Sequence, residues 1–172
     1  MDTPTILTEN LKLRKIELND YIDLYDLCSD NEVTKYLSFN THKNILETKK
    51  FVKKYINKEK NDNHFFWVIV KDNKAIGTIE AYINEENLSE IAFALSKNYW
   101  NKGYMTEVLK NIINFLFSLG VKKIRAMHIK ENIVSGVVMS KIGMIKNDFS
   151  KPTFKKNNIT YNLIEYYILN NQ

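Results

Sequence analysis

The stretch that decides the fold is Lys97-Asn98-Tyr99-Trp100-Asn101-Lys102-Gly103-Tyr104-Met105-Thr106-Glu107. An alternating segment precedes it, with apolar side chains at Leu88, Ile91, Phe93 and Leu95. Behind it, apolar residues recur at three- and four-residue spacing: Met105, Val108, Leu109, Ile112, Ile113, Leu116 and Phe117. The first period is that of a half-buried strand and the second that of an amphipathic helix. The sequence therefore predicts a strand over residues 88–95 that runs through a short basic turn into a helix over residues 103–118.

This turn has the features of an anion-binding loop. The first amides of a helix have no partner within the helix and together carry about half a positive charge, here next to the ammonium of Lys102. Gly103 has no Cβ, so an anion can approach the main chain closely. A diphosphate group fits such a site. A plain strand-to-helix connection has the same pattern, however, so the loop alone does not identify a ligand.

About seven strands and about four helices are expected along the chain. The strands are expected at residues 11–16, 64–71, 75–83, 88–95, 122–129, 144–150 and 159–169. Two helices are expected to follow N-caps at Asn19 and Thr41, and two more to span residues 103–118 and 132–142. Short polar turns between the middle strands indicate an antiparallel meander. The strand-helix-strand step that ends at residue 129 indicates a right-handed parallel crossover. The expected fold class is α/β (α+β).

Length and composition are those of a single domain. The chain has 172 residues, of which 44% are hydrophobic and 12% aromatic, which is enough to build one core. We therefore expect residues 1–172 to form one domain. The longest purely apolar run, Phe65–Val70, is far shorter than the roughly 20 residues of a membrane span. Residues Met1–Asn10 lack the basic flank and apolar segment of a secretory signal, so a cytoplasmic location is expected.

Cysteine, histidine and arginine are too few for several kinds of site. Cys28 is the only cysteine, which excludes an internal disulfide and a multi-cysteine zinc site. The three histidines show no ligand-like spacing, so no metal is expected. The net charge of +5 comes almost wholly from lysine, because Arg14 and Arg125 are the only arginines. Scattered lysines favour a solvated surface over a nucleic-acid groove.

A second segment adds to the loop: Asn132-Ile133-Val134-Ser135-Gly136-Val137-Val138-Met139-Ser140-Lys141-Ile142-Gly143-Met144. At the start of a helix, Asn132 and Ser135 place an amide and a hydroxyl about one turn apart. Such a pair can form hydrogen bonds with a polar ligand. The alternative is a simple capping pair, with Asn132 as the N-cap.

Together, the two segments resemble the GNAT acetyltransferase superfamily and, within it, the ribosomal-protein N-acetyltransferase branch. The family's phosphate loop reads Gln/Arg-x-x-Gly-x-Gly/Ala. Here Trp100 stands at the first position, Gly103 matches, and Met105 replaces the last small residue. In the second segment the Asn, Ser, Lys and Gly have the spacing typical of the branch. The resemblance covers Leu11 to Leu169 and implies a mixed, mostly antiparallel central sheet flanked by helices.

The resemblance implies acetyl-CoA as co-substrate and N-acetylation as the reaction. The residues implied to bind acetyl-CoA are Phe93, Ala94, Leu95, Asn101, Lys102, Gly103, Tyr104, Met105, Thr106, Asn132 and Ser135. In the family, the strand before the loop splays from its neighbour and offers backbone N–H groups to the thioester carbonyl. These groups would come from Phe93 to Leu95.

The acceptor amine must lose a proton, because a lysine amine titrates near 10.4 and an α-amine near 8. We predict Glu90 as the base that takes this proton, with Glu80 and His128 as alternatives. The departing thiolate needs little help, since a thiol titrates near 8.5. Many relatives use a tyrosine on the second helix at this step. Met139 occupies that part of the helix here, so we predict assistance from Ser135.

The motifs describe the donor and leave the acceptor open. A protein N-terminal amine is the expected acceptor, with a polyamine or an aminoglycoside as alternatives. A basic surface argues mildly against a free polycation. The choice would depend on residues 19–57 and 151–158. A non-catalytic CoA-binding regulator and an RNA-binding protein with a vestigial site are two further alternatives. The last strand carries Tyr161, Tyr166 and Tyr167 and could pair with a second copy in a homodimer.

Overall fold

The computed structural model describes residues 2–58 and 63–170. The strands are β1 (Ile6–Leu7), β2 (Lys12–Lys15), β3 (His64–Lys71), β4 (Lys74–Ile83), β5 (Leu88–Leu95), β6 (Lys123–Ile129), β7 (Ile145–Lys146), β8 (Thr153–Lys156) and β9 (Ile159–Leu169). The helices are α1 (Tyr21–Ser29), α2 (Asn31–Thr34), α3 (Ile45–Lys58), α4 (Tyr104–Ser118) and α5 (Ile133–Lys141). Two short 3-10 helices are η1 (Leu18–Asp20) and η2 (Lys97–Tyr99).

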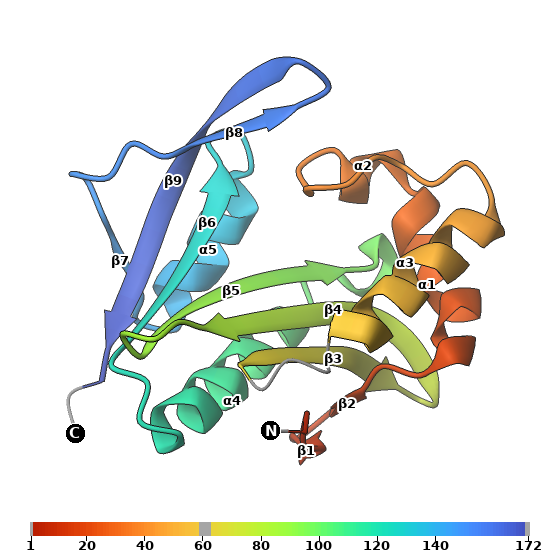
Figure 1. The fold of residues 1–172 in the computed structure, drawn as a ribbon, viewed down its shortest axis with the longest axis horizontal. Coiled ribbons are helices and arrows are strands. Elements are labelled where there is room, and N and C mark those ends of the chain that lie inside the picture. Colours follow the sequence, from red (N-terminus) through yellow and green to blue (C-terminus); the bar gives the residue numbers. More distant parts are fainter. Residues whose placement is uncertain (1, 59–62, 171–172) are drawn as a thin grey trace.

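The strands form one mixed sheet in the order β1-β2-β3-β4-β5-β6-β9-β7, with β8 paired to β9 (Figure 1). In this sheet β5 and β6 pair in parallel and the other pairs are antiparallel. The predicted fold class and the parallel step are thus confirmed. The described residues hold nine strands instead of about seven, because β1 and β8 were not predicted; they have only two and four residues, too few to show a clear alternation. The strand expected over residues 144–150 is only two residues long, as β7.

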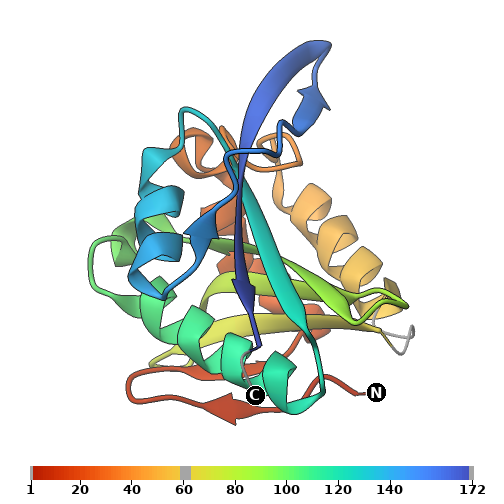
Figure 2. The same cartoon turned by 90° about the vertical axis from the view of Figure 1, so that its left-hand side faces the viewer.

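Helices cover both faces of the sheet. Figures 1 and 2 show α4 and α5 on one face and α1 and α3 on the other. The apolar run on β3 is explained by this arrangement, since alternate side chains of a strand point to opposite faces. Phe65, Trp67 and Ile69 pack in the core beneath α4, whereas Phe66, Val68 and Val70 pack with α1 and α3. Among residues 2–58 and 63–170, no helix has both the length and the apolar character to span a bilayer.

The sheet opens between β5 and β6. The parallel pairing joins Leu88–Ile91 to Lys123–Ala126 and goes no further. Beyond it, residues 92–95 of β5 pair with β4 alone, while the end of β6 pairs with β9 (Figure 1). Gly77 on β4 allows this end of β5 to approach closely, because a Cβ at that position would lie only 2.5 Å from the carbonyl oxygen of Ala94. The divergence leaves one side of the β5 backbone without a strand partner.

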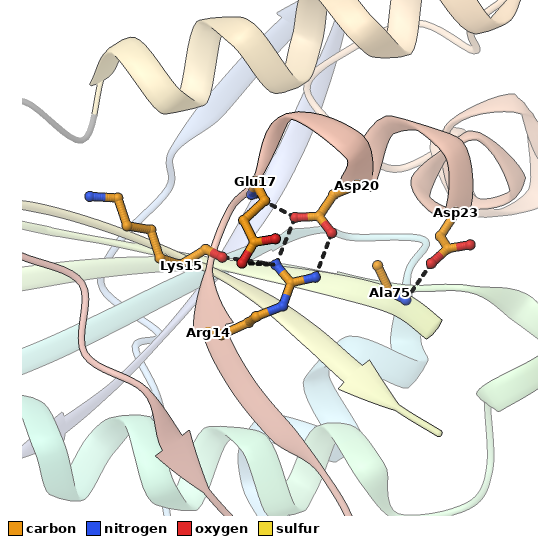
Figure 3. A network of polar contacts seen from close by, with 6 residues as sticks. All are labelled: Arg14, Lys15, Glu17, Asp20, Asp23 and Ala75. Carbon is orange, nitrogen blue, oxygen red and sulfur yellow. Dashed lines mark hydrogen bonds and ion pairs between the residues drawn. The ribbon is translucent and has the colours of Figure 1, made fainter. Parts of the chain in front are cut away.

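A polar network fixes helix α1 against the sheet (Figure 3). The guanidinium of Arg14 donates two hydrogen bonds to the buried carboxylate of Asp20, at 2.6 and 2.9 Å. The backbone N–H of Glu17 donates to the same carboxylate at 2.7 Å. Asp23 on α1 accepts the N–H of Ala75 on β4 at 2.9 Å. These contacts hold η1 and α1 against β2 and β4.

Two predicted N-caps are wrong. Asn19 lies inside η1, and α1 begins at Tyr21. Helix α3 begins at Ile45, where the side chain of Asn44 accepts the N–H groups of Leu46 and Glu47. The hydroxyl of Thr41 donates to Asn31 instead. A predicted helix start can slip by a turn because several capping residues stand close together in residues 40–44.

Candidate functional site

A cleft of about 480 Å³ opens where β5 leaves β6. Four segments line it: the end of β5, the loop that leads into α4, the first part of α5, and the residues around α2. Nearly all of the predicted acetyl-CoA residues line it, namely Phe93, Ala94, Leu95, Asn101, Gly103, Tyr104, Met105, Thr106, Asn132 and Ser135. The fold therefore brings together two sequence segments that are about thirty residues apart.

The loop before α4 is held by its own side chains. The indole Nε1 of Trp100 donates to the carbonyl oxygen of Leu95 at 2.7 Å, so the loop is tied to the end of β5. Asn101 and Gly103 have φ values of 59° and 79°, in the left-handed region that Gly and Asn adopt at least cost. Lys102 is exposed and does not line the cleft; its ammonium lies 5.4 Å from the centre of the Tyr99 ring.

Helix α4 begins at this loop with Gly103 as its N-cap residue. The amides of its first turn have no partner within the helix, and the residues that carry them line the cleft. Glu107 fixes this end from the far side: its carboxylate accepts the hydroxyl of Thr8 and the backbone and side-chain amides of Asn10. Burial alone would raise the pKa of Glu107, but these hydrogen bonds outweigh it and hold the pKa below its usual value.

The end of β5 directs backbone N–H groups to the cleft. In the antiparallel β4–β5 pair, the N–H of Ser96 donates to Ile76 and the N–H of Asn84 donates to Leu88. By alternation along the strand, Ala94 also bonds to β4, whereas the N–H and C=O groups of Phe93 and Leu95 point away from β4. The contact of the Leu95 carbonyl with Trp100 agrees with this direction. The side of β5 that faces away from β4, toward the opening between β5 and β6, thus has two N–H donors, those of Phe93 and Leu95.

Asn132 and Ser135 form a polar pair at the start of α5. The side-chain amide of Asn132 donates to the Ser135 hydroxyl oxygen at 2.9 Å, and Asn132 makes no side-chain capping bond. Since the hydroxyl oxygen accepts from Asn132, its own proton is available for another acceptor. The pair can therefore donate a hydrogen bond into the cleft.

The predicted base, Glu90, lies outside the cleft lining. Its carboxylate is bound by Arg125 on β6, with Nη2 and Nε at 2.8 and 3.0 Å from Oε2. Glu90 shares a sheet face with Glu80 and Ala94, because these residues have the same parity in the β4–β5 register. Ala94 lines the cleft and lies four residues further along β5, which is about 13 Å.

The two alternative bases have different surroundings. Glu80 accepts a hydrogen bond of 2.6 Å from Nε2 of His64 and one of 3.2 Å from the ammonium of Lys58. Burial alone would raise the pKa of Glu80, but these contacts lower it overall. His128 is buried under α5 and donates from Nδ1 to the carbonyl of Ile129. Burial lowers the pKa of His128, and this residue does not line the cleft.

The sequence patterns missed one wall of the cleft. It consists of residues around α2, of which Val33, Tyr36 and Leu37 line the cleft. No periodicity or motif marks them, because the helix has only four residues. In the described part of the chain, no three His, Cys, Asp or Glu side chains gather as a potential metal site.

Comparison with known proteins identifies the family. The model of the acetyltransferase (GNAT) domain matches residues 10–145. The chain belongs to the GNAT acetyltransferase family. It is 34% identical to the uncharacterized N-acetyltransferase YnaD of Bacillus subtilis (strain 168) over 168 residues, which cover 95% of this chain and 96% of that protein. As a member of this family, the protein is an acyltransferase.

Solved GNAT structures have the same fold. A GNAT acetyltransferase from Bacillus anthracis superposes with a TM-score of 0.82 at 27% identity, covering 96% of this chain and 98% of that one. RimL, a ribosomal-protein α-N-acetyltransferase solved in complex with coenzyme A, superposes with a TM-score of 0.85 at 17% identity and with the same coverage. At that identity the second likeness concerns the fold alone.

Proposed function

We propose that this GNAT protein transfers the acetyl group of acetyl-CoA to a primary amine, with the α-amine of a protein N-terminus as the preferred acceptor. One observation carries the proposal: the N–H groups of Phe93 and Leu95, which point away from β4, share a cleft with the first-turn amides of α4 and the Asn132–Ser135 pair. RimL, a protein of the same fold, supports the donor through its bound coenzyme A and the acceptor class through its description as a ribosomal-protein α-N-acetyltransferase.

Each part of the donor has a partner of fitting chemistry in the cleft. The diphosphate would accept hydrogen bonds from the backbone of residues 101–106, beside the positive charge of Lys102. Asn132 and Ser135 would bind the polar pantetheine arm. The N–H groups of Phe93 and Leu95 would donate to the thioester carbonyl oxygen, where negative charge develops in the transition state. Ala94 would contact the donor through its side chain, since its N–H is directed to β4.

The reaction is a direct acyl transfer. The neutral amine attacks the carbonyl carbon, so that a C–N bond forms and the C–S bond breaks. A carboxylate base takes the amine proton, and the released thiolate accepts a hydrogen bond from the Ser135 hydroxyl and then takes a proton from water. Glu90 would act as the base through water, given its distance along β5 from Ala94. Glu80 is the competing base, because it pairs with Ala92 and so lies two residues nearer to the cleft.

The two bases are distinguished by pH profiles. We expect Glu90→Gln to lower kcat/KM at least ten-fold and to remove the enzyme's part of the acidic limb of its pH dependence, which reports the base in the free enzyme. The part of the limb that reports protonation of the acceptor amine should remain. Glu80→Gln is the matched variant on the neighbouring strand and should keep that limb. The opposite pattern would assign the base to Glu80.

The acceptor is tested by a thiol-release screen with acetyl-CoA and three amine classes: N-terminal peptides, polyamines and aminoglycosides. Release of coenzyme A with the peptides supports the proposal. If coenzyme A is released only with a polyamine or an aminoglycoside, the proposed acceptor class is wrong, and the proposal of acetyl transfer to an amine stands. Tight binding of acetyl-CoA without release in any arm overturns catalysis and supports a CoA-binding regulator.

A further inference from the structure

The wall around α2 lies next to the place where the thioester carbonyl would bind. Val33 is buried in a small cluster with Leu27 and Cys28, and both Leu37 and Ala94 pack against this cluster. Ala94 stands between Phe93 and Leu95, whose N–H groups face the gap. A substituent on the carbonyl carbon would therefore lie close to the side chains of this wall.

The wall presents hydrocarbon to the cleft. The two charged side chains on it are turned to other partners: Glu32 is bound by Lys97 at 2.8 Å, and the ammonium of Lys35 lies 4.9 Å from the centre of the Tyr36 ring. Val33 and Leu37 are left as the cleft-lining aliphatic groups of this segment. An aliphatic chain is stabilised by burial against such a surface, whereas a carboxylate there would lose its hydration.

The β8–β9 hairpin holds the wall in place. The ammonium of Lys156 donates to the carbonyl oxygens of Thr34 and Leu37, both at 2.9 Å. Next to it, the side chains of Asn157 and Asn40 exchange two hydrogen bonds, at 2.9 and 3.1 Å. Figure 1 shows this hairpin reaching over the open side of the sheet toward α2. The width of the cleft at the wall is thus set by a segment about 120 residues away in the sequence.

We propose that Val33 and Leu37 form an apolar subsite for the acyl chain of the donor, so that the enzyme uses propionyl- and butyryl-CoA as well as acetyl-CoA, and that Lys156 sets the depth of this subsite. The inference rests on the proposed function. The chemistry is unchanged by the longer chain: the C–S bond breaks, the C–N bond forms, and the amine proton leaves to the base.

The test is thiol release with acetyl-, propionyl-, butyryl- and succinyl-CoA at a fixed acceptor. For the wild type we expect kcat/KM with butyryl-CoA within ten-fold of that with acetyl-CoA, and at least 100-fold lower values with succinyl-CoA. Leu37→Phe fills the subsite and should lower the butyryl-to-acetyl ratio about 15-fold, at roughly four-fold for each methylene no longer buried. Leu37→Ala should raise the ratio. Leu46→Phe changes an exposed leucine outside the cleft and should leave it unchanged.

Lys156→Met removes the two hydrogen bonds and keeps the aliphatic stem. We expect a changed butyryl-to-acetyl ratio together with faster amide hydrogen exchange in residues 34–41. Lys155→Met, at the exposed neighbouring position on β8, should do neither. If the wild type turns over acetyl-CoA but uses butyryl-CoA more than 1000-fold less well, or if Leu37→Phe lowers both rates equally, the subsite is refuted while the proposed function stands. If no thioester is used at all, the proposed function fails, and the subsite with it.

Discussion

Gly103 allows a sharp test of the proposed diphosphate site. Its φ is 79°, and a Cβ built on it would have no neighbour within 4 Å, so Gly103→Ala creates no clash within the protein. The expected cost to folding is the left-handed backbone alone, about 1–2 kcal/mol. For a chain of this size that lowers Tm by roughly 2–8 °C.

The effect on binding should be larger than the effect on stability. A methyl group at this position keeps phosphate oxygens away from the first-turn amides of α4. Loss of one hydrogen bond to a charged group costs about 1.5–3 kcal/mol, so the Kd for acetyl-CoA should rise roughly 10- to 150-fold. Isothermal titration with acetyl-CoA measures this change directly, and a thermal melt of the same sample measures the stability.

Gly120 provides the matched control. Its φ is 84°, and a Cβ there would also have no neighbour within 4 Å, but it lies just beyond the other end of α4 and outside the cleft. Gly120→Ala should lower Tm by a similar amount and leave the Kd for acetyl-CoA unchanged within two-fold. If both substitutions weaken acetyl-CoA binding equally, the loss of affinity follows from the loss of stability alone. If Gly103→Ala binds acetyl-CoA with wild-type affinity, the first-turn amides of α4 do not bind the diphosphate.

Three further outcomes are expected. Asp20→Asn breaks the bidentate contact with Arg14 at a buried position and should lower the free energy of unfolding by about 2–3 kcal/mol; a shift of the urea midpoint at constant m checks this. Glu107 has a lowered pKa in the folded state, so the stability it contributes is present above its unfolded value near 4.3 and is lost as the pH falls through the folded value. Glu107→Gln should therefore flatten the dependence of urea stability on pH between about 5 and 3, and an unaltered curve would exclude this role. Ser135→Ala should lower kcat about ten-fold and change the Kd for acetyl-CoA less than three-fold. The effect on kcat is smaller than is usual for proton transfer, because a thiol is an easy leaving group. A larger change in Kd than in kcat would make Ser135 a binding residue only.

The backbone conformation near the cleft depends on neighbouring residues in the sequence. Asn101, Gly103, Gly120 and Gly143 all have positive φ, at the positions where the loop begins, where α4 starts and where α4 and α5 end. These features are encoded within a few residues, because only residues without a bulky Cβ substituent tolerate the left-handed region. The helix over 103–118, predicted from the periodicity of its apolar residues, is confirmed as α4.

Residues whose partners lie far away in the sequence were predicted less well. Alternation could show that Glu90 and Glu80 lie on a strand face, but the partners of the two carboxylates come from β6, α3 and β3. The role of Glu90 as base stays a prediction. The homodimer also stays a prediction: Tyr166 and Tyr167 are half-buried, and β9 already pairs with β6, β7 and β8.

The sequence by itself determined the loop around Gly103, the helix that follows it and the family, because backbone conformation and apolar periodicity are local properties of the chain. The tertiary structure alone decided that β5 leaves β6 after Ile91 and which N–H groups of β5 are thereby left without a strand partner. It also decided that the α2 segment forms a wall of the cleft, with two of its carbonyl oxygens bound by Lys156. Those features depend on strand register and on contacts between residues up to about 120 positions apart, and no local pattern encodes them.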